Sequence, residues 1–148
     1  MIDGIEIRSA TTGDLDDIRR VEAAAFTSPW RREFFEAELQ LPGRVTLVAV
    51  DGTGEVAGYV FAMFIFDEMH INKIAVSASF RRRGIARSLM KRCLEFARGH
   101  DIHLISLEVR KSNDGAQAFY RRLEFTETFI RPRYYPDGEA AVVMSLVV

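Results

Sequence analysis

The order of apolar and polar positions predicts short strands alternating with helices. After Thr11, four apolar residues recur at helical spacing, which indicates an amphipathic helix with one buried face: Leu15, Ile18, Val21 and Ala25. Thr11 followed by Asp14 is typical of the capping box that opens such a helix. A short strand is expected before this helix, over 5–8, and a second helix after it, over 31–39.

The rest of the chain continues the alternation. The segments 45–50 and 56–66 are β-rich and flank a turn of Asp, Gly and Thr residues, so they predict an antiparallel hairpin. Strands are expected over 70–76, 103–109, 125–130 and 140–147, and helices over 84–98 and 113–122. The order β-α-α-β-β-β-α-β-α-β-β predicts an α+β fold, grouped with α/β in some schemes, in which helices flank a mixed, mostly antiparallel sheet of seven strands.

Composition narrows the class of protein. A chain of 148 residues fits a single domain over 1–148, and a net charge of -1 gives no support to a nucleic-acid binder. Cys93 is the one cysteine, which rules out an intramolecular disulfide. The longest apolar run, near 59–66, is too short for a membrane helix, and the first four residues lack the layout of a signal peptide. We therefore expect a soluble, cytoplasmic protein without a membrane partner, either a monomer or a weak homodimer.

A basic turn between a strand and a helix is the first candidate site. The strand ends with Ile74, Ala75 and Val76, and a run of arginines leads into a helix that opens with small residues: Arg81, Arg82, Arg83, Gly84, Ile85, Ala86 and Arg87. Free N–H groups at a helix start, together with the helix dipole, bind phosphate. The alternative is an ordinary helix start with a solvated arginine run. The spacing matches neither a P-loop nor a dinucleotide fingerprint.

A carboxylate and a phenol form the second candidate site. Glu108 interrupts the apolar run 102–109, so it either faces solvent by strand alternation or lies in a cleft. Tyr120 lies in the following helix, where a core position is the alternative. Acyl transfer to an amine needs a base for the ammonium proton and an acid for the leaving thiolate, and these two groups suit both tasks. Proton donation from a tyrosine (pKa ~10) to a thiolate (~8.5) costs roughly 2 kcal/mol.

Both segments resemble the GNAT acetyltransferases. Arg81, Gly84 and Ala86 fill the Arg/Gln-x-x-Gly-x-Gly/Ala signature, and Glu108-Val-Arg-x-Ser-Asn113 with Tyr120 is similar to the RimI and Nα-acetyltransferase branch. The resemblance covers nearly the whole chain. It implies that backbone amides of the 81–87 loop bind the CoA pyrophosphate and that Ile74, Ala75 and Val76 pair with the pantetheine arm, which Asn113 and Tyr120 also contact. It further implies Glu108 as general base and Tyr120 as general acid.

The resemblance extends to an acceptor side. Pro29-Trp30 resembles the element before the substrate loop of the RimI branch, and Tyr134-Tyr135 resembles a stretch that lines the peptide site. A surface aromatic loop is the alternative for the tyrosines. His70 and His103 have no metal-ligand spacing, so we interpret both as structural or edge residues and expect no metal. Glu124 stands where bacterial relatives usually have glycine.

The expected activity is direct transfer of acetyl from acetyl-CoA to a protein or peptide N-terminus. The resemblance suggests the N-terminal alanine of a small-subunit ribosomal protein. Two alternatives remain: a GNAT enzyme acting on a lysine side chain or a small amine, and a CoA-binding regulatory domain without turnover. Nucleic-acid binding has only the arginine cluster in its favour, and we expect no nucleic-acid partner.

Overall fold

The computed structural model describes residues 4–148, and within this range the strands form one twisted sheet in the order β1-β2-β3-β4-β5-β7-β6. The strands are β1 (Glu6–Ser9), β2 (Arg44–Val50), β3 (Val56–Ile65), β4 (Glu68–Val76), β5 (Leu104–Arg110), β6 (Thr126–Arg131) and β7 (Ala141–Val147). Neighbouring strands pair antiparallel except β4 and β5, which are parallel. The mixed, mostly antiparallel α+β sheet that the pattern predicted is confirmed.

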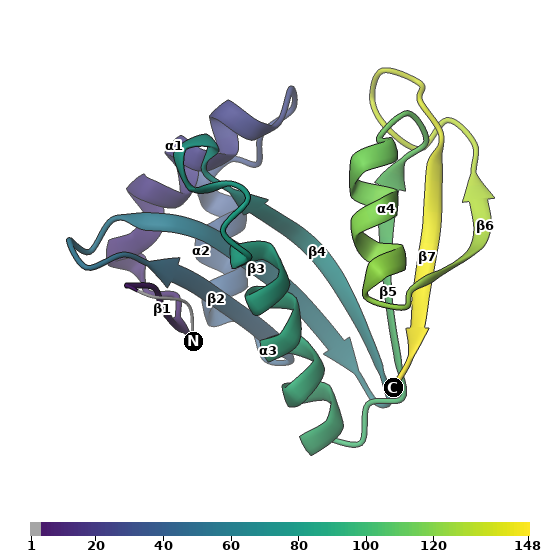
Figure 1. Cartoon of the computed structure of the whole chain (residues 1–148), viewed down its shortest axis with the longest axis horizontal. Coiled ribbons are helices and arrows are strands. Elements are labelled where there is room, and N and C mark those ends of the chain that lie inside the picture. Colours follow the sequence, from purple (N-terminus) through teal and green to yellow (C-terminus); the bar gives the residue numbers. More distant parts are fainter. Residues whose placement is uncertain (1–3) are drawn as a thin grey trace.

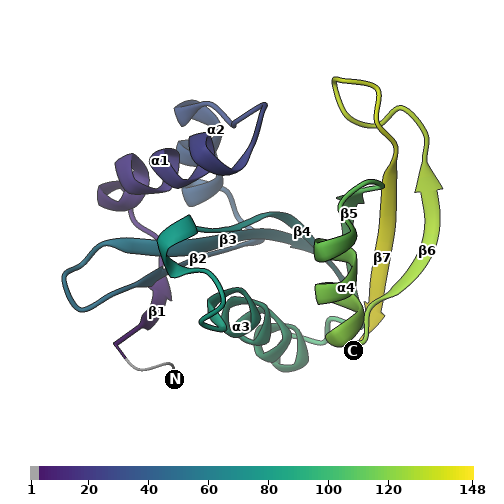
Figure 2. The same cartoon turned by 45° about the horizontal axis from the view of Figure 1, so that its top comes forward.

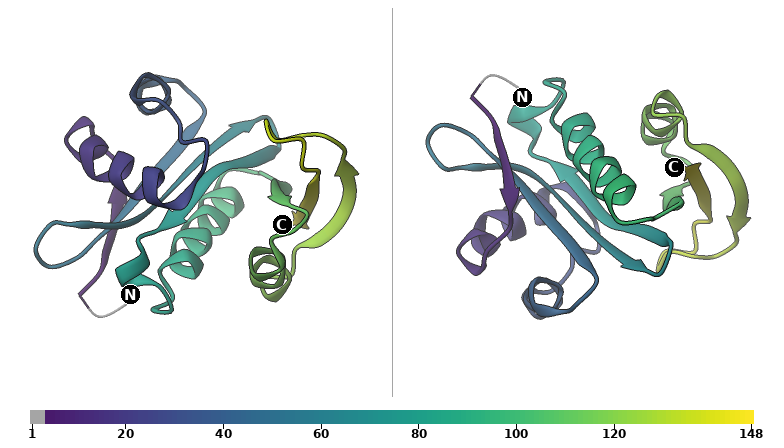
Figure 3. Two further views of the ribbon diagram at one scale, coloured as in Figure 1. Left: turned by 90° about the horizontal axis from the view of Figure 1, so that it is seen from above. Right: turned by 90° about the horizontal axis from the view of Figure 1, so that it is seen from below.

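Helices cover both faces of the sheet. Figure 3 shows α1 (Leu15–Ala25) and α2 (Arg32–Gln40) on one face and α3 (Ile85–Gly99) and α4 (Asp114–Arg122) on the other. A separate apolar core fills each side. The spacing of apolar residues on α1 explains its place, since Leu15 and Ile18 are completely buried.

Local signals explain where the elements begin and end. The Asp14 carboxylate accepts a hydrogen bond from the Thr11 N–H at 2.8 Å, as the predicted capping box requires, at the start of the short helix η1 (Thr12–Asp14). β3 stops before Phe66, whose φ of 55° is left-handed. A 3₁₀ turn, η2 (Ala78–Phe80), lies where the sequence pattern had indicated only a loop. Within the described range, no helix combines the length and the apolarity needed to cross a bilayer.

The separation of β4 from β5 creates the central feature of the fold. The two strands pair at three positions only, Glu68 to His70 opposite Leu104 to Ser106. Beyond that point β4 has a bulge at Asn72, because Phe61 of β3 pairs with Lys73 while Ala62 pairs with Ile71. A bulge bends a strand and increases its twist. Figure 1 shows β4 and β5 joined near the C-terminus and diverging from there.

Candidate active site

A cleft of about 720 Å³ lies where β4 and β5 diverge. Its walls come from β4, β5, the start of α4, and the two loops that follow α1 and β6. Figure 2 shows these loops projecting from the same side of the molecule, on either side of β4 and β5. Seven of the predicted site residues line this cleft: Trp30, Ile74, Glu108, Asn113, Tyr120, Tyr134 and Tyr135.

A second pocket of about 240 Å³ shares Ile74 and Tyr120 with the cleft. Ala75, Val76, Arg81 and Ala86 also line it. The predicted strand end and basic turn therefore lie beside the predicted acid. Since Tyr120 belongs to both cavities, the two candidate sites of the sequence form one continuous region.

The start of α3 suits an anion. Gly84 is the N-cap residue with a φ of 78°, and Arg82 is also left-handed with a φ of 63°. The N–H groups of the first helical turn have no intrahelical acceptors, so they are available to a ligand. The Ile85 side chain is buried in the core, so only its backbone can serve a ligand. Arg82, Arg83 and Arg87 line neither cavity with their side chains.

One edge of β4 is available for pairing. Among residues 4–148, no strand pairs with β4 on the β5 side after His70, although β3 pairs along the other edge. Gly58 of β3 lies against this segment: a Cβ there would stand 2.9 Å from the Ala75 carbonyl oxygen. An extended ligand with amide groups fits such an edge, because it can hydrogen-bond as an added strand. The pantetheine arm of CoA has such amides.

Glu108 faces the cleft rather than bulk solvent. Its side chain is 12% exposed, its Oε2 contacts the Nε2 of His70, and its Oε1 lies 3.6 Å from Nε of Arg131. Burial alone would raise the pKa of Glu108, but the hydrogen bond from His70 and the charges of His70 and Arg131 together hold it below its usual value. Glu108 is therefore a carboxylate at neutral pH.

His70 is part of this site, so its interpretation as a structural or edge residue is wrong. Its Nδ1 lies 2.5 Å from Oδ1 of Asn72, while its Nε2 contacts Glu108. Burial lowers the pKa of His70, but hydrogen bonds to Glu108 and Asn72 outweigh this and raise it. The sequence pattern missed the contact because it depends on the parallel register of β4 and β5. His103 precedes β5 instead of lying in it, and its backbone bonds to Asp67 and Val148.

Tyr120 combines the two roles considered for it. Its ring packs in the core against Phe119 and Phe125, with 7% of the residue exposed. The residue also lines both cavities, so its side chain contributes to the site as well as to the core. Burial, with a smaller contribution from Tyr135, raises the pKa of Tyr120, so the hydroxyl stays protonated and can donate a hydrogen bond.

A buried carboxylate fixes the loop that follows α1. Glu22 is fully buried, and its carboxylate accepts hydrogen bonds from the Trp30 N–H at 2.8 Å and from the Tyr59 hydroxyl. The Lys73 ammonium lies 3.0 Å from the same carboxylate and 3.5 Å from the centre of the Phe26 ring. This network places Trp30 at the cleft. The burial of Glu22 could have been predicted from the sequence, because Glu22 follows Ile18 by four residues and so shares the buried face of α1.

Two further predicted residues serve in other ways. Pro29 is exposed and lies outside the cleft that Trp30 lines. The Asn113 side chain caps α4 by accepting a hydrogen bond from the Ala116 N–H at 3.0 Å, although the residue also lines the cleft.

Across residues 4–148, histidine, cysteine and carboxylate side chains nowhere gather in threes as a metal site would require.

Comparisons with known proteins agree with this geometry. A family model described as "Acetyltransferase (GNAT) family" matches residues 15–125. The chain is 32% identical to the [ribosomal protein bS18]-alanine N-acetyltransferase of Escherichia coli, with 96% of this chain and 97% of that protein covered. It is also 32% identical to an N-alpha-acetyltransferase of Sulfolobus acidocaldarius, over 95% of this chain and 90% of that protein.

Solved structures give the same result. The crystal structure of the ribosomal-protein-alanine N-acetyltransferase from Escherichia coli superimposes with a TM-score of 0.89 at 31% identity, covering 97% of this chain and 94% of that chain. The similarity therefore extends over the sheet, the helices and the loops that form the cleft.

Proposed function

Because this chain belongs to the acetyltransferase (GNAT) family, it is an acetyl-CoA-dependent N-acetyltransferase, and we propose that it acetylates the N-terminal α-amine of a protein. The names of its relatives in Escherichia coli and Sulfolobus acidocaldarius support this acceptor class. The observation that carries the proposal is the cleft beside β4, which has aromatic residues and Glu108 in its walls. We propose the N-terminal alanine of a small-subunit ribosomal protein as the acceptor.

The residues of the smaller pocket would hold the donor. The N–H groups at the start of α3 suit the pyrophosphate, and the free edge of β4 from 74 to 76 suits the amides of the pantetheine arm. Bound there, acetyl-CoA supplies a thioester whose carbonyl carbon is open to an amine. Ala75 and Ala86 leave room in the pocket because their side chains are small.

Glu108 would receive the acceptor amine. Its carboxylate attracts a positively charged N-terminus, and His70 and Arg131 keep it ionised. These same interactions make Glu108 a weak base. An α-ammonium has a pKa of about 8, so little assistance is required, and proton removal through a water molecule next to Glu108 meets the need.

Tyr120 would serve the leaving group. Its hydroxyl group is positioned to donate a hydrogen bond to the thiolate that departs, while N–H groups on the free edge of β4 stabilise negative charge on the carbonyl oxygen. The raised pKa of Tyr120 increases the cost of full proton transfer beyond roughly 2 kcal/mol. Stabilisation of the thiolate by this hydrogen bond is therefore the main role that we assign to it.

The reaction needs no metal, since an amine attacks a thioester directly. All the groups assigned come from one chain, so a monomer or a weak homodimer suffices. A cytoplasmic location is part of the same proposal, because acetyl-CoA and new ribosomal proteins would both be available there.

A mass-spectrometric assay tests the proposal. The purified protein is incubated with acetyl-CoA and a peptide that begins with alanine and contains an internal lysine, and fragmentation locates the acetyl group. We expect acetyl on the α-amine, with kcat reduced about a hundredfold in Glu108→Gln and about tenfold in Tyr120→Phe. Acetyl only on the lysine, or none, would exclude this acceptor class.

A further inference from the structure

The loop between β6 and β7 brings two aromatic side chains to the cleft. Tyr134, Tyr135 and Pro136, which we call the aromatic lip, all line it, and the two tyrosine rings meet edge to face with centroids 5.0 Å apart. The lip lies in a connection of nine residues between Arg131 and Ala141. A loop of this length has no fixed conformation unless other contacts hold it.

Glu139 holds the backbone of the lip. Its carbonyl oxygen accepts hydrogen bonds from the N–H groups of both Tyr134 and Tyr135, each at 3.1 Å. The turn that follows is closed by Gly138, whose N–H donates to the Tyr135 carbonyl at 2.8 Å. Gly138 has a φ of 90°, which glycine adopts without strain.

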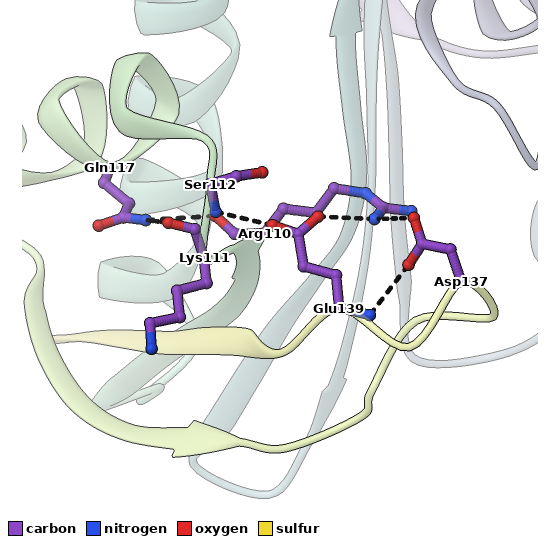
Figure 4. A network of polar contacts seen from close by, with 6 residues as sticks. All are labelled: Arg110, Lys111, Ser112, Gln117, Asp137 and Glu139. Carbon is purple, nitrogen blue, oxygen red and sulfur yellow. Dashed lines mark hydrogen bonds and ion pairs between the residues drawn. The ribbon is translucent and has the colours of Figure 1, made fainter.

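The side chain of Glu139 ties the same loop to the end of β5. Its Oε1 accepts from Nη1 of Arg110 at 2.9 Å, and its Oε2 accepts from the Ser112 N–H at 2.8 Å. Asp137 accepts from the same Arg110 nitrogen at 2.8 Å. Figure 4 shows this network, with Glu139 and Asp137 on the loop facing Arg110 and Ser112 across the gap between the two elements.

Arg110 connects the network to the catalytic side of the cleft. Its guanidinium lies 4.1 Å from the centre of the Tyr135 ring, and it follows Glu108 by two residues on β5. Its carbonyl and that of Lys111 accept hydrogen bonds from the buried side chain of Gln117, at 3.2 and 3.0 Å. Gln117 lies on α4, one turn before Tyr120. The lip is therefore fixed relative to both proposed catalytic groups.

We propose that Glu139, acting through Arg110 and the Ser112 N–H, is a positioning residue that sets the aromatic lip for acceptor binding. This inference rests on the proposed function, because it takes the lip as one wall of the acceptor site. Glu139 does not line the donor pocket. The network is charge-assisted and only about a quarter exposed at Glu139 (24%), so it is strong enough to order a loop.

The test separates acceptor binding from chemistry. In Glu139→Gln we expect the KM for the peptide to rise about tenfold, because the charge-assisted hydrogen bonds that order the lip are weakened. We expect kcat and the KM for acetyl-CoA to stay within about twofold of wild type, since neither pocket residue nor catalytic group is changed. Glu127→Gln is the matched control: this carboxylate lies on β6, 3.9 Å from Arg121, and away from the lip.

Intrinsic fluorescence provides a second measurement. The chain has one tryptophan, and Trp30 lines the cleft opposite the lip, so its emission reports acceptor binding directly. If the wild type proves to modify another acceptor, the proposed function fails. The role of Glu139 can still be decided, because titration of that other acceptor, followed by Trp30 emission, compares its affinity for the wild type and for Glu139→Gln. Arg110→Gln should raise the acceptor KM similarly, and the double variant should be no worse than either single one.

Other results would overturn the proposal. An unchanged acceptor KM in Glu139→Gln would show that the lip needs no such support. An equal rise in the KM for acetyl-CoA and in the KM for the peptide would show that Glu139 supports the fold as a whole. Additive effects of Glu139→Gln and Arg110→Gln on the acceptor KM would show that the two residues act separately.

Discussion

The buried pair of Glu22 and Lys73 permits a quantitative test of what holds the acceptor side together. Glu22 is fully buried, Lys73 is 13% exposed at its side chain, and the carboxylate also accepts from Trp30 and Tyr59. In Glu22→Gln the Lys73 ammonium loses its counterion. In Lys73→Met the Glu22 carboxylate keeps two hydrogen-bond donors but loses its counterion.

The magnitude follows from the asymmetry of buried ion pairs. Removing one partner typically costs about 3–5 kcal/mol, because the other charge remains uncompensated. We expect each single variant near the lower limit, about 3 kcal/mol, since Lys73 retains some exposure and Glu22 retains its donors. For a chain of this length that lowers Tm by about 6–12 °C. In the double variant neither charge remains, so the cost should be well below the sum of the two single costs.

Chemical denaturation of the wild type, both single variants and the double variant gives the four corners of a double-mutant cycle. Glu127→Gln serves as the exposed control, with an expected change within about 0.5 kcal/mol. If the two single costs simply add in the double variant, the charges do not interact and the reasoning fails. The same holds if either single variant is as stable as the wild type.

Three other predictions concern the cleft. The raised pKa of His70 contributes stability below pH 6.5, and this stability is lost as the pH rises through the pKa of the folded state. The lowered pKa of Glu108 contributes stability above pH 4.5, which is lost as the pH falls through its pKa in the folded state. His70→Gln should therefore lower Tm most between these two pH values and approach the wild-type Tm toward alkaline pH in thermal scans, whereas a pH-independent loss would contradict the pairing. Gly58→Ala places a Cβ against the Ala75 carbonyl, so the KM for acetyl-CoA should rise several-fold and the free energy of unfolding should fall by about 1–3 kcal/mol. An unchanged KM would show that the backbone of β4 can shift to accommodate the added methyl group. Asn113→Ala removes the cap of α4, which should cost about 1 kcal/mol in denaturant titrations; no change in stability would mean that the cap is not formed in solution.

The sequence predicted the local elements and failed where a contact depends on register. Apolar spacing was sufficient for α1 and for the hairpin of β2 and β3, because both signals lie within a few adjacent residues. His70 looked like an edge residue since nothing near it in sequence indicates that β5 brings Glu108 alongside. That contact needs three parallel pairs between strands separated by a whole helix.

Chemistry in the loops was also only partly predictable. Trp30 was expected at the cleft from a motif, yet the carboxylate that holds it, Glu22, was overlooked although it lies on the apolar face of α1. Tyr134 and Tyr135 were expected to line the acceptor site, while no role was predicted for Glu139, which fixes their backbone. The bulge at Asn72 has no local sequence mark either, since it results from competition between two neighbouring strands.

The short paired segment between β4 and β5 also has a consequence for the motion of the whole molecule. In the described part of the chain, three register pairs join the half-sheet of β1 to β4 to the half-sheet of β5 to β7. Donor and acceptor would each contact both halves, so the first to bind restricts their relative movement and the second loses less conformational entropy. Binding of the two substrates should therefore be cooperative, and by thermodynamic linkage each should increase the affinity for the other by the same factor.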